Sequence, residues 1–416
     1  MPGWAPSIRP SGAGTYMFLG AAIGVTAGLT VGALIQNRPL KKRCIESPRS
    51  SQLPHLTKEQ IDQLPYPPNA LPGGRDVDTP YGCLKVFEWG PEDGEKVLLL
   101  HGISTPCVAL GDVGDELVKS GYRVMIFDYF GRGYSDAPTG LPYDIGLYTT
   151  QILLALASSK LAWTGNDGFH LVGYSLGGGL AIPFARNFPH MVRSVVCIAG
   201  GGLIRPGHVS WSSRVLYSAG IFPQWVLEAL VRRRLMPAAS KPAATETTLA
   251  SEVAGVRGPP KKKKHKNSDA NGGDGWDNAV LSRRRPGHTV SAVMDWQLRH
   301  HHGFIPAFMS SIRHAPIYEQ REEWRAFGEL LAERRRDADW EETEDRLPGL
   351  KGGRVLLVLG SQDPVIVKEE LIHDATAVLG EDGFEAVVLN CGHELVMTNS
   401  AEVASVMISF WIRSCA

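Results

Sequence analysis

The sequence contains few cysteines and arranges none of them in a metal-binding or disulfide pattern. Six cysteines occur among 416 residues, and no two form a Cys-x-x-Cys pair, so neither a zinc site nor a disulfide framework is indicated. Asn-x-Ser/Thr sequons are also absent, which argues weakly against the secretory lumen. The hydrophobic fraction of 43% is that of a globular protein, and it excludes a chain that is disordered, collagenous or coiled-coil throughout.

Net charge is absent as well, because 43 basic residues balance 43 acidic ones. This balance argues against a dedicated nucleic-acid-binding protein, which usually carries a basic excess. The charges are nevertheless unevenly distributed along the chain. Residues 1–50 carry six basic residues against one acidic, and residues 251–290 carry nine against four. The rest of the chain is therefore acidic, and the two basic segments are interpreted as parts with separate functions.

Residues 15–37 contain no charged side chain and follow a short tail, residues 1–14. About 20 apolar residues suffice to cross a bilayer as a helix, so this segment is predicted to be a single transmembrane anchor. Only Arg9 precedes it, whereas four basic residues lie within 38–43, and this asymmetry predicts that the rest of the chain faces the cytosol. The moderate hydrophobicity favours the outer mitochondrial membrane or the endoplasmic reticulum.

Glycine recurs at every fourth position of the predicted anchor. Such a face permits close approach of two helices, and it predicts self-association through Gly20, Gly24, Gly28 and Gly32. Small residues that merely fill a single span, and a signal peptide that is removed, remain the alternatives.

Two parts of the chain alternate short apolar runs with segments of helical spacing, namely residues 74–200 and 347–416. Near-continuous apolar strands separated by helices are typical of a parallel sheet covered on both faces. The expected strands are 84–89, 97–100, 124–127, 170–173, 194–199, 355–359 and 386–389. The preceding residues, 38–73, are predicted to be a linker, because residues 45–73 are rich in proline and serine, and a short helix is expected within it at about residues 58–64.

Residues 201–346 interrupt this alternation and are too many for a loop in a compact domain. Aromatic and aliphatic residues at helical spacing predict a helical cap there. Within it, residues 237–287 are rich in small residues, proline and lysine, and include runs of four lysines and three arginines. Such a composition buries too little apolar surface to fold by itself, so this stretch is predicted to be a disordered basic insertion.

Ser175 is the candidate nucleophile. It is the centre of the Gly-x-Ser-x-Gly pentapeptide Gly173–Gly177, which follows an apolar run and precedes a helical pattern. In that context the serine occupies a sharp turn between strand and helix, and Gly173 and Gly177 allow the backbone to approach closely. An ordinary tight turn would leave the repeated glycines unexplained.

A serine hydroxyl needs a base, and the base needs an orienting carboxylate. Asp363 and His393 each follow a predicted strand, in the chain order serine, acid, histidine. Sites of open α/β sheets gather at the carboxyl ends of strands, so these residues are predicted to complete a triad with Ser175. Asp382 and Glu394 are alternative carboxylates, but neither ends a strand as directly.

The negative charge of a tetrahedral intermediate requires two backbone N–H donors. We expect one from Leu176, directly after the nucleophile, and the other from Ile103 in the loop after the strand 97–100. Gly102 would let this loop turn tightly, and His101 is expected to support the loop rather than act as a base. Adjacent histidines on a helix point in different directions, so the run His300–His302 is not expected to bind a metal.

These motifs, together with the segment Asp128–Asp136 (DYFGRGYSD), resemble the serine α/β-hydrolase family. The resemblance covers about residues 74–200 and 347–416 and is closest in appearance to lidded lipases, esterases and carbon–carbon-bond hydrolases. The anchor is similar to that of membrane-bound monoacylglycerol lipases. The family implies a mostly parallel central sheet with helices on both faces and a helical cap after the sixth strand. It also implies the triad of Ser175, Asp363 and His393.

The function expected from these residues is hydrolysis of carboxylic esters, lipophilic ones in particular, through an acyl-enzyme intermediate. The expected partners are a small-molecule ester and a membrane, with no nucleic acid, metal or cofactor. Thioester or carbon–carbon-bond hydrolysis by the same triad is an alternative. A catalytically silent interaction protein on this scaffold is a further one.

Overall fold

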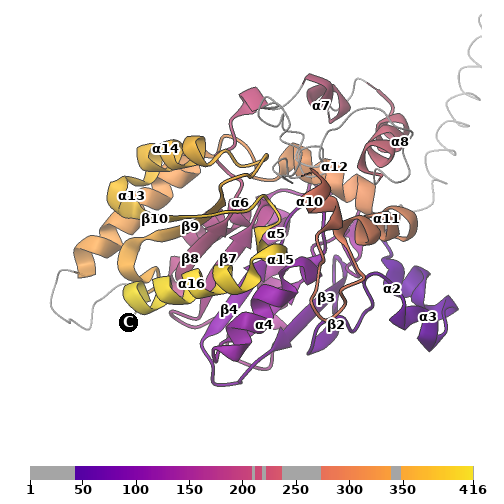
Figure 1. Ribbon diagram of the computed structural model, residues 1–416, viewed down its shortest axis with the longest axis horizontal. Coiled ribbons are helices and arrows are strands. Elements are labelled where there is room, and N and C mark those ends of the chain that lie inside the picture. The colour runs from indigo at the N-terminus through magenta and orange to yellow at the C-terminus, as the bar shows by residue number, and fades with distance from the viewer. Residues whose placement is uncertain (1–42, 209–210, 218–221, 237–272, 339–347, 416) are drawn as a thin grey trace, which may run out of the picture. The chain divides into compact units, whose positions relative to one another are not determined.

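The protein is described by a computed structural model over residues 43–208, 211–217, 222–236, 273–338 and 348–415 (Figure 1). Residues 44–416 form one unit. The predicted tail 1–14 and anchor 15–37, with its four glycines, lie outside the described residues and stay predictions. No helix in the part of the chain that the structure describes is long and apolar enough to span a membrane.

The centre of this unit is an eight-stranded sheet in the order β10-β9-β8-β7-β4-β5-β3-β2. The strands are parallel except for β3, which runs antiparallel to its neighbours β2 and β5. Every apolar run expected from the sequence forms a strand here, which confirms the fold. The strands are β2 Gly74–Thr79, β3 Gly82–Trp89, β4 Lys96–Leu100, β5 Arg123–Phe127, β7 Phe169–Tyr174, β8 Val192–Ile198, β9 Val355–Gly360 and β10 Phe384–Leu389.

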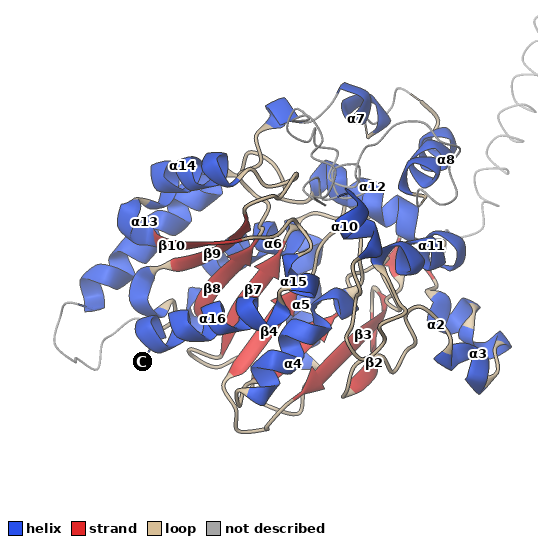
Figure 2. Cartoon of the chain, viewed as in Figure 1, coloured by secondary structure: helices blue, strands red, loops and turns tan. Residues whose placement is uncertain are grey.

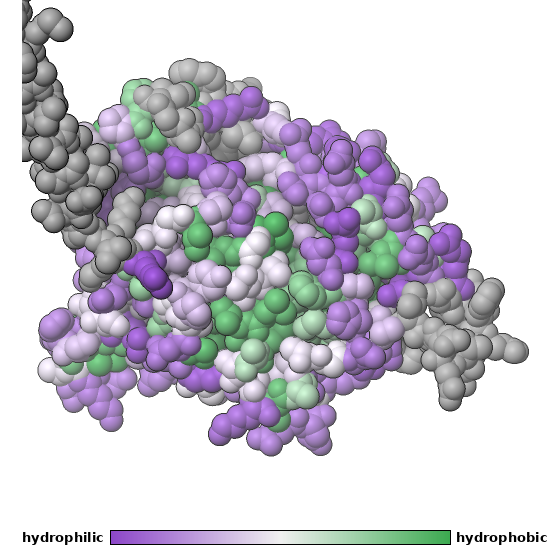
Figure 3. Space-filling view, turned by 180° about the vertical axis from the view of Figure 1, so that it is seen from behind, coloured by the Kyte–Doolittle hydropathy of each residue, from purple (hydrophilic) through white to green (hydrophobic). Residues whose placement is uncertain are grey.

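Helices cover both faces of the sheet (Figure 2). The side chains of its central strands are apolar on both faces, so both faces must be shielded from water. One layer contains α4 Gly111–Lys119, α15 Leu395–Thr398 and α16 Ser400–Cys415. The other contains α5 Ile145–Ala157, α6 Leu176–Asn187, α13 Arg321–Ala338 and α14 Lys368–Leu379. From behind, apolar residues gather in the middle of the molecular surface, bordered by hydrophilic ones (Figure 3).

The expected cap follows β8, the sixth strand of the sheet along the chain, and lies beyond the carboxyl ends of the parallel strands (Figure 1). Its helices are α7 Trp211–Leu216, α8 Gln224–Leu235, α10 Gly273–Asn278, α11 Val290–His300 and α12 Phe304–His314. Helix α13 also falls in the range 201–346, but it packs against α6 and α14. This last helix of the range therefore belongs to the helical layer of the core.

Residues 44–73 of the predicted linker pack on the core rather than forming a free tether, and the short helix expected around residues 58–64 is present. Strand β1 Cys44–Ile45 pairs with β6 Ala137–Pro138, and the segment continues through α2 Pro48–Ser51 and α3 Lys58–Asp62. The ring of Tyr66 is fully buried, and its hydroxyl donates a hydrogen bond to Asp128 at 3.0 Å. Proline and serine here form short helices that pack on the core, which composition alone does not distinguish from a free tether.

The prediction of disorder over residues 237–287 is also corrected in part. Residues 237–272 lie outside the described residues, whereas 273–287 are folded. Trp276 and Leu281 are buried at 3% and 2% exposure, and the stretch leads through an antiparallel bridge between Val280 and Thr289 into α11.

Short 3-10 helices complete the described part of the chain. They are η1 Leu53–His55, η2 Cys107–Leu110, η3 Pro189–Met191, η4 Pro206–His208, η6 Lys351–Gly353 and η7 Glu381–Gly383.

Candidate active site

Ser175 connects the carboxyl end of β7 to the first turn of α6 and has an unusual backbone conformation. Its φ of 54° and ψ of −115° are costly for a residue with a side chain, and such strain is common at functional sites. The turn closes only because the residues two positions before and two positions after Ser175 are glycines. A Cβ at Gly173 would lie 2.1 Å from the carbonyl oxygen of Gly177, and a Cβ at Gly177 would lie 2.2 Å from that of Leu100.

The structure brings Ser175, His393 and Asp363 into one hydrogen-bonded chain. Nε2 of His393 lies 3.1 Å from Oγ of Ser175, and Nδ1 of His393 lies 2.7 Å from Oδ2 of Asp363. The imidazole and the carboxylate are buried, at 5% and 0% side-chain exposure. These distances are those required of a nucleophile, a base and an orienting acid.

The Asp363 carboxylate is held by its own loop. Its Oδ1 accepts hydrogen bonds from the backbone N–H groups of Val365 at 2.7 Å and Ile366 at 2.9 Å, which leaves Oδ2 for His393. Neither alternative carboxylate is bonded to the imidazole. Asp382 is exposed, and Oε1 of Glu394 accepts from the N–H of Gly392 at 3.1 Å.

Tyr174 contacts His393 through both its hydroxyl and its ring. Its hydroxyl donates a hydrogen bond to the carbonyl oxygen of His393 at 2.7 Å, and the centroids of the two rings lie 5.3 Å apart. Burial raises the pKa of Tyr174 well above its usual value, so the phenol remains a donor. The sequence offered no signal for this role, because Tyr174 occupies the variable second position of the Gly-x-Ser-x-Gly pentapeptide.

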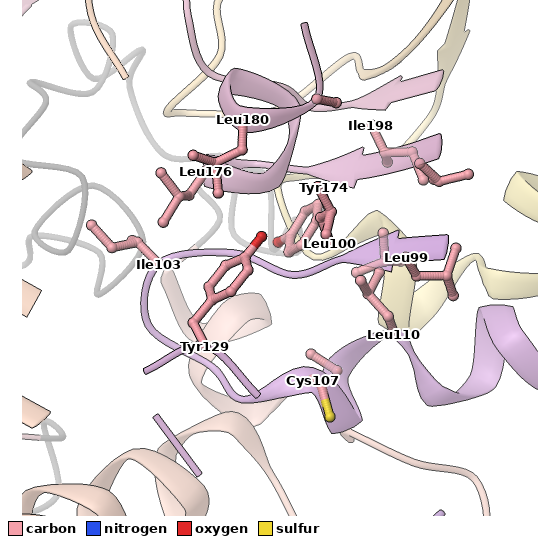
Figure 4. Packing of buried hydrophobic residues seen from close by; sticks show 14 of the residues in the cluster. Leu99, Leu100, Ile103, Cys107, Leu110, Tyr129, Tyr174, Leu176, Leu180 and Ile198 are labelled. Carbon is pink, nitrogen blue, oxygen red and sulfur yellow. The ribbon is translucent and has the colours of Figure 1, made fainter. Parts of the chain in front are cut away.

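The two expected oxyanion donors lie on neighbouring elements. Leu176 begins α6, and Ile103 lies on the loop after β4, with both side chains at the same edge of the buried cluster (Figure 4). Among the described residues, neither backbone N–H has a hydrogen-bond partner. Gly102 lies beside the turn that carries Ser175, because a Cβ at Gly102 would be 3.5 Å from the Cβ of Ser175.

His101 is fully buried, and both of its ring nitrogens lie within hydrogen-bond distance of a backbone group. Nε2 accepts the backbone N–H of Tyr129 at 2.9 Å, and Nδ1 lies 2.7 Å from the carbonyl oxygen of Gly102. These contacts define a neutral imidazole with its proton on Nδ1. Burial, followed by the charge of Arg132, lowers the pKa of His101 to about 3. A supporting role therefore fits this geometry.

Arg132 is hydrogen-bonded to the backbone of the loop after β4. Its buried guanidinium donates to the carbonyl oxygens of Ile103 at 3.0 Å and Phe130 at 3.1 Å. A third bond, 2.8 Å long, reaches the hydroxyl of Ser311 on cap helix α12. The sequence motif around Arg132 was recognised, but its link to Ile103 spans two loops and carries no local pattern.

Trp276 of α10 was also missed by the sequence reasoning. Its ring centroid lies 5.6 Å from that of His393, with the planes tilted by 40°. The indole N–H is buried, and nothing in the described part of the chain accepts its hydrogen bond. A tryptophan in a segment of small and polar residues gives no indication of what it packs against.

No metal site is formed by the residues that the structure describes, since no three histidine, cysteine or acidic side chains gather suitably. In the histidine run 300–302, the central His301 is buried, and its Nε2 lies 2.9 Å from the carbonyl oxygen of Ser135. Burial lowers the pKa of His301 to about 4. This histidine therefore packs the cap onto the core in its neutral form.

Comparison with known proteins gives one family. A serine hydrolase-like protein of Dictyostelium discoideum is 30% identical over 141 residues, 33% of this chain but only 38% of that protein. A 2-hydroxy-6-oxo-2,4-heptadienoate hydrolase of Pseudomonas putida is 32% identical over 113 residues, 26% of this chain and 39% of that one. The alignments thus span well under half of either relative.

A solved structure supports the same fold at low sequence identity. A bacterial membrane phospholipase A superposes with a TM-score of 0.52 at 16% identity, over 96% of each chain. The family profile described as the alpha/beta hydrolase fold matches residues 96–400, a range that begins at β4 and ends in the first turn of α16. The protein belongs to the α/β-hydrolase family.

Proposed function

We propose that the protein is a serine hydrolase that cleaves carboxylic esters through an acyl-enzyme intermediate. The observation that carries this proposal is the hydrogen-bonded chain from Ser175 Oγ through the His393 imidazole to Asp363, with contacts of 3.1 and 2.7 Å. The strained backbone of Ser175, two N–H groups that have no hydrogen-bond partner among the described residues, and a buried orienting carboxylate support the same chemistry.

In the acylation step, Nε2 of His393 takes the proton from Ser175 Oγ as the oxygen attacks the ester carbonyl carbon. The imidazolium that forms is stabilised by Asp363, which keeps the Nδ1 proton directed at Oδ2. The N–H groups of Ile103 and Leu176 stabilise the developing oxyanion. His393 then returns its proton to the leaving alkoxide, and the alcohol departs.

In the deacylation step, His393 takes a proton from water, and the resulting hydroxide attacks the acyl-enzyme carbonyl. The second tetrahedral intermediate uses the same two N–H donors. Its collapse breaks the bond to Ser175 Oγ, which regains its proton from His393, and releases the carboxylic acid. Only groups of this chain and one water molecule are needed.

A fluorophosphonate probe tests the reaction type, because it phosphonylates activated serines. We expect the wild type to be labelled and Ser175→Ala to remain unlabelled with its fold intact by circular dichroism. An unlabelled wild type would instead favour the silent interaction protein on the same scaffold.

Carbon–carbon-bond hydrolysis is a second candidate, favoured by the similarity to the Pseudomonas hydrolase. A matched panel separates the candidates: an ester and a thioester of one acyl group, and a 2-hydroxy-6-oxodienoate. We expect the highest kcat/KM on the ester. A preference for the thioester or the dienoate would retain the triad and change the substrate class.

We further propose that residues 15–37 anchor the protein in a membrane with the hydrolase domain in the cytosol, and that its substrates are lipophilic. Support comes from the uncharged length of this segment and the basic residues that follow it. Protease treatment of intact organelles tests the orientation, since a protected hydrolase domain contradicts it.

Self-association of the anchor through its glycine face is a separate proposal. Crosslinking of the Gly24→Leu and Gly28→Leu variants tests this helix pairing.

A further inference from the structure

The indole of Trp276 packs beside the imidazole of His393. The two ring centroids lie 5.6 Å apart, and Tyr174 approaches the same imidazole at 5.3 Å. Trp276 and His393 are only 3% and 4% exposed. The neighbouring Gly275 lies against Glu394, because a Cβ there would be 3.7 Å from its Oε1. The first turn after the catalytic histidine is therefore in contact with α10.

Residues 275–288, which we call the Trp276 loop, are fastened to the core by three consecutive arginines. The backbone N–H of Arg283 donates to Asp112 at 2.9 Å, and its guanidinium pairs with Glu116. The guanidinium of Arg284 binds both carboxylate oxygens of Asp115, at 2.8 and 2.7 Å. All three acidic residues belong to α4 of the core.

Further bonds close the loop on itself and on the N-terminal segment. Arg285 donates to the carbonyl oxygen of Asp62 at 2.8 Å. The backbone N–H of Leu281 donates to the carbonyl oxygen of His288 at 3.0 Å, and the backbone N–H of Val290 donates to the carbonyl oxygen of Ala279 at 2.9 Å. The Trp276 loop is thus held at both of its sides, and the indole is carried by a fastened segment.

The chemistry of the triad fixes which part of a substrate this indole meets. A general acid must lie within hydrogen-bond reach of the atom that it protonates. Because His393 protonates the leaving oxygen, the leaving group must lie on the His393 side of Ser175. A large side chain packed beside His393 therefore borders the leaving group, whereas the acyl chain extends away from it.

We propose that Trp276 is a specificity-determining residue that limits the bulk of the leaving group, and that the pairs of Arg283 and Arg284 with α4 hold it in place. This inference rests on the proposed function and names the part of the substrate that the site selects. The three-arginine run then fastens the segment that carries Trp276, although composition predicted disorder there.

Two pairs of esters test the role of Trp276. One pair keeps butanoate and changes the alcohol from ethanol to cyclohexylmethanol; the other keeps ethanol and changes the acid from butanoate to cyclohexylpropanoate. For Trp276→Ala we expect the kcat/KM ratio of bulky to small alcohol to rise about tenfold, since a methylene or more of pocket space has an effect of this order. The ratio for the acyl pair should change by less than about twofold.

The comparison of two ratios guards against a loss of folding, since unfolding lowers the rates on all three esters together. Trp276→Phe, which keeps an aromatic wall, should restore most of the wild-type discrimination. Trp225→Ala is the matched control, because Trp225 lies on α8 with 73% of its surface exposed, and both ratios should remain those of the wild type. An unchanged alcohol ratio in Trp276→Ala, or an equal change in the acyl ratio, overturns the proposal.

The fastening is tested with the double variant Arg283→Ala, Arg284→Ala. We expect the alcohol ratio to shift in the same direction as in Trp276→Ala but less, because half-exposed ion pairs each contribute little. Arg299→Ala removes an exposed ion pair with Asp295 on α11 and serves as the control. A double variant with the wild-type ratio overturns the fastening.

Fluorophosphonate labelling distinguishes a failure of the Trp276 proposal from a failure of the proposed serine hydrolase function. If the wild type and Trp276→Ala are both labelled but share one alcohol ratio, the inference fails and the proposed function stands. If the wild type is neither labelled nor able to cleave any of the three esters, the proposed function fails and this inference fails with it.

Discussion

Arg132 donates a hydrogen bond from Nε to the carbonyl oxygen of Ile103, 3.0 Å away, and so ties a buried cation to the loop that carries an expected oxyanion donor. We predict that Arg132→Met lowers kcat by about 10²–10³, the cost of losing one such donor. Two buried carbonyl oxygens also lose a partner, which costs about 1–3 kcal/mol each in the free energy of unfolding. Ester kinetics and urea unfolding measure the two effects.

Ser311→Ala is the control for Arg132, because it removes the bond from the guanidinium to α12 and leaves the bond to Ile103 intact. Its kcat should stay near that of the wild type. If Arg132→Met loses stability but retains kcat, the guanidinium supports the fold alone and does not position the oxyanion loop.

Asp363→Asn should inactivate the enzyme without unfolding it. The amide oxygen of asparagine can still accept the N–H groups of Val365 and Ile366, so the loop keeps its shape. The amide nitrogen then faces Nδ1 of His393 and stabilises the tautomer whose Nε2 cannot accept the serine proton. A fall in kcat on the order of 10⁴ is expected for this change. Unchanged thermal unfolding together with that fall is the result to look for, and a fall below tenfold would assign another orienting acid.

The sheet and the turn at Ser175 could be predicted, because each is encoded by a short stretch of neighbouring residues. A strand buried on both faces is a continuous apolar run, as in Val355–Gly360, and the close approach at Gly173 requires glycine whatever surrounds it. Asp363 and His393 were identifiable because the carboxyl ends of parallel strands meet at one edge.

The missed contacts join segments that are far apart in the sequence. Arg284 meets Asp115 across 169 positions, and this pairing orders a stretch whose composition predicts disorder. Tyr66 likewise reaches Asp128 across 62 positions. Composition measures what a segment can bury by itself, and it is silent about partners that the rest of the fold supplies.

Two buried neutral histidines predict a loss of stability in acid. The pKa values of His101 and His301 are lowered to about 3 and about 4 by burial, so unfolding lets each bind a proton below its ordinary value. Their contribution is complete above about pH 6.5 and is lost as the pH falls toward the folded values. Each should remove about 2 kcal/mol of unfolding free energy between pH 7 and pH 5.

His301→Gln isolates one of these contributions, because glutamine keeps a donor near the carbonyl oxygen of Ser135 and does not titrate. Urea unfolding at pH 7 and pH 5 should show a decline about 2 kcal/mol smaller in the variant than in the wild type. Equal declines in the two proteins would mean that His301 is protonated in the folded state.

The segment 44–73 should be required for folding, whereas residues 1–43 should not. A chain that starts at Cys44 keeps the bonds from Ser47 N–H to Asp136 and from the Tyr66 hydroxyl to Asp128. A chain that starts at Gly74 loses both and exposes the apolar surface that Tyr66 and Leu71 cover. We predict wild-type thermal stability of the hydrolase unit for the first truncation and insoluble or unfolded protein for the second.

Tyr66→Phe tests the same contact within the full chain. The fully buried Asp128 loses one of its hydrogen-bond donors while the aromatic ring remains, and a buried acceptor without its partner costs about 1–3 kcal/mol. Desolvation already raises the pKa of Asp128, and the loss of this donor should raise it further. Urea unfolding of Tyr66→Phe beside Tyr81→Phe, a tyrosine at the partly exposed turn before β3, measures the difference. If the two variants are equally stable, residues 44–73 pack on the core without contributing to its stability through Asp128.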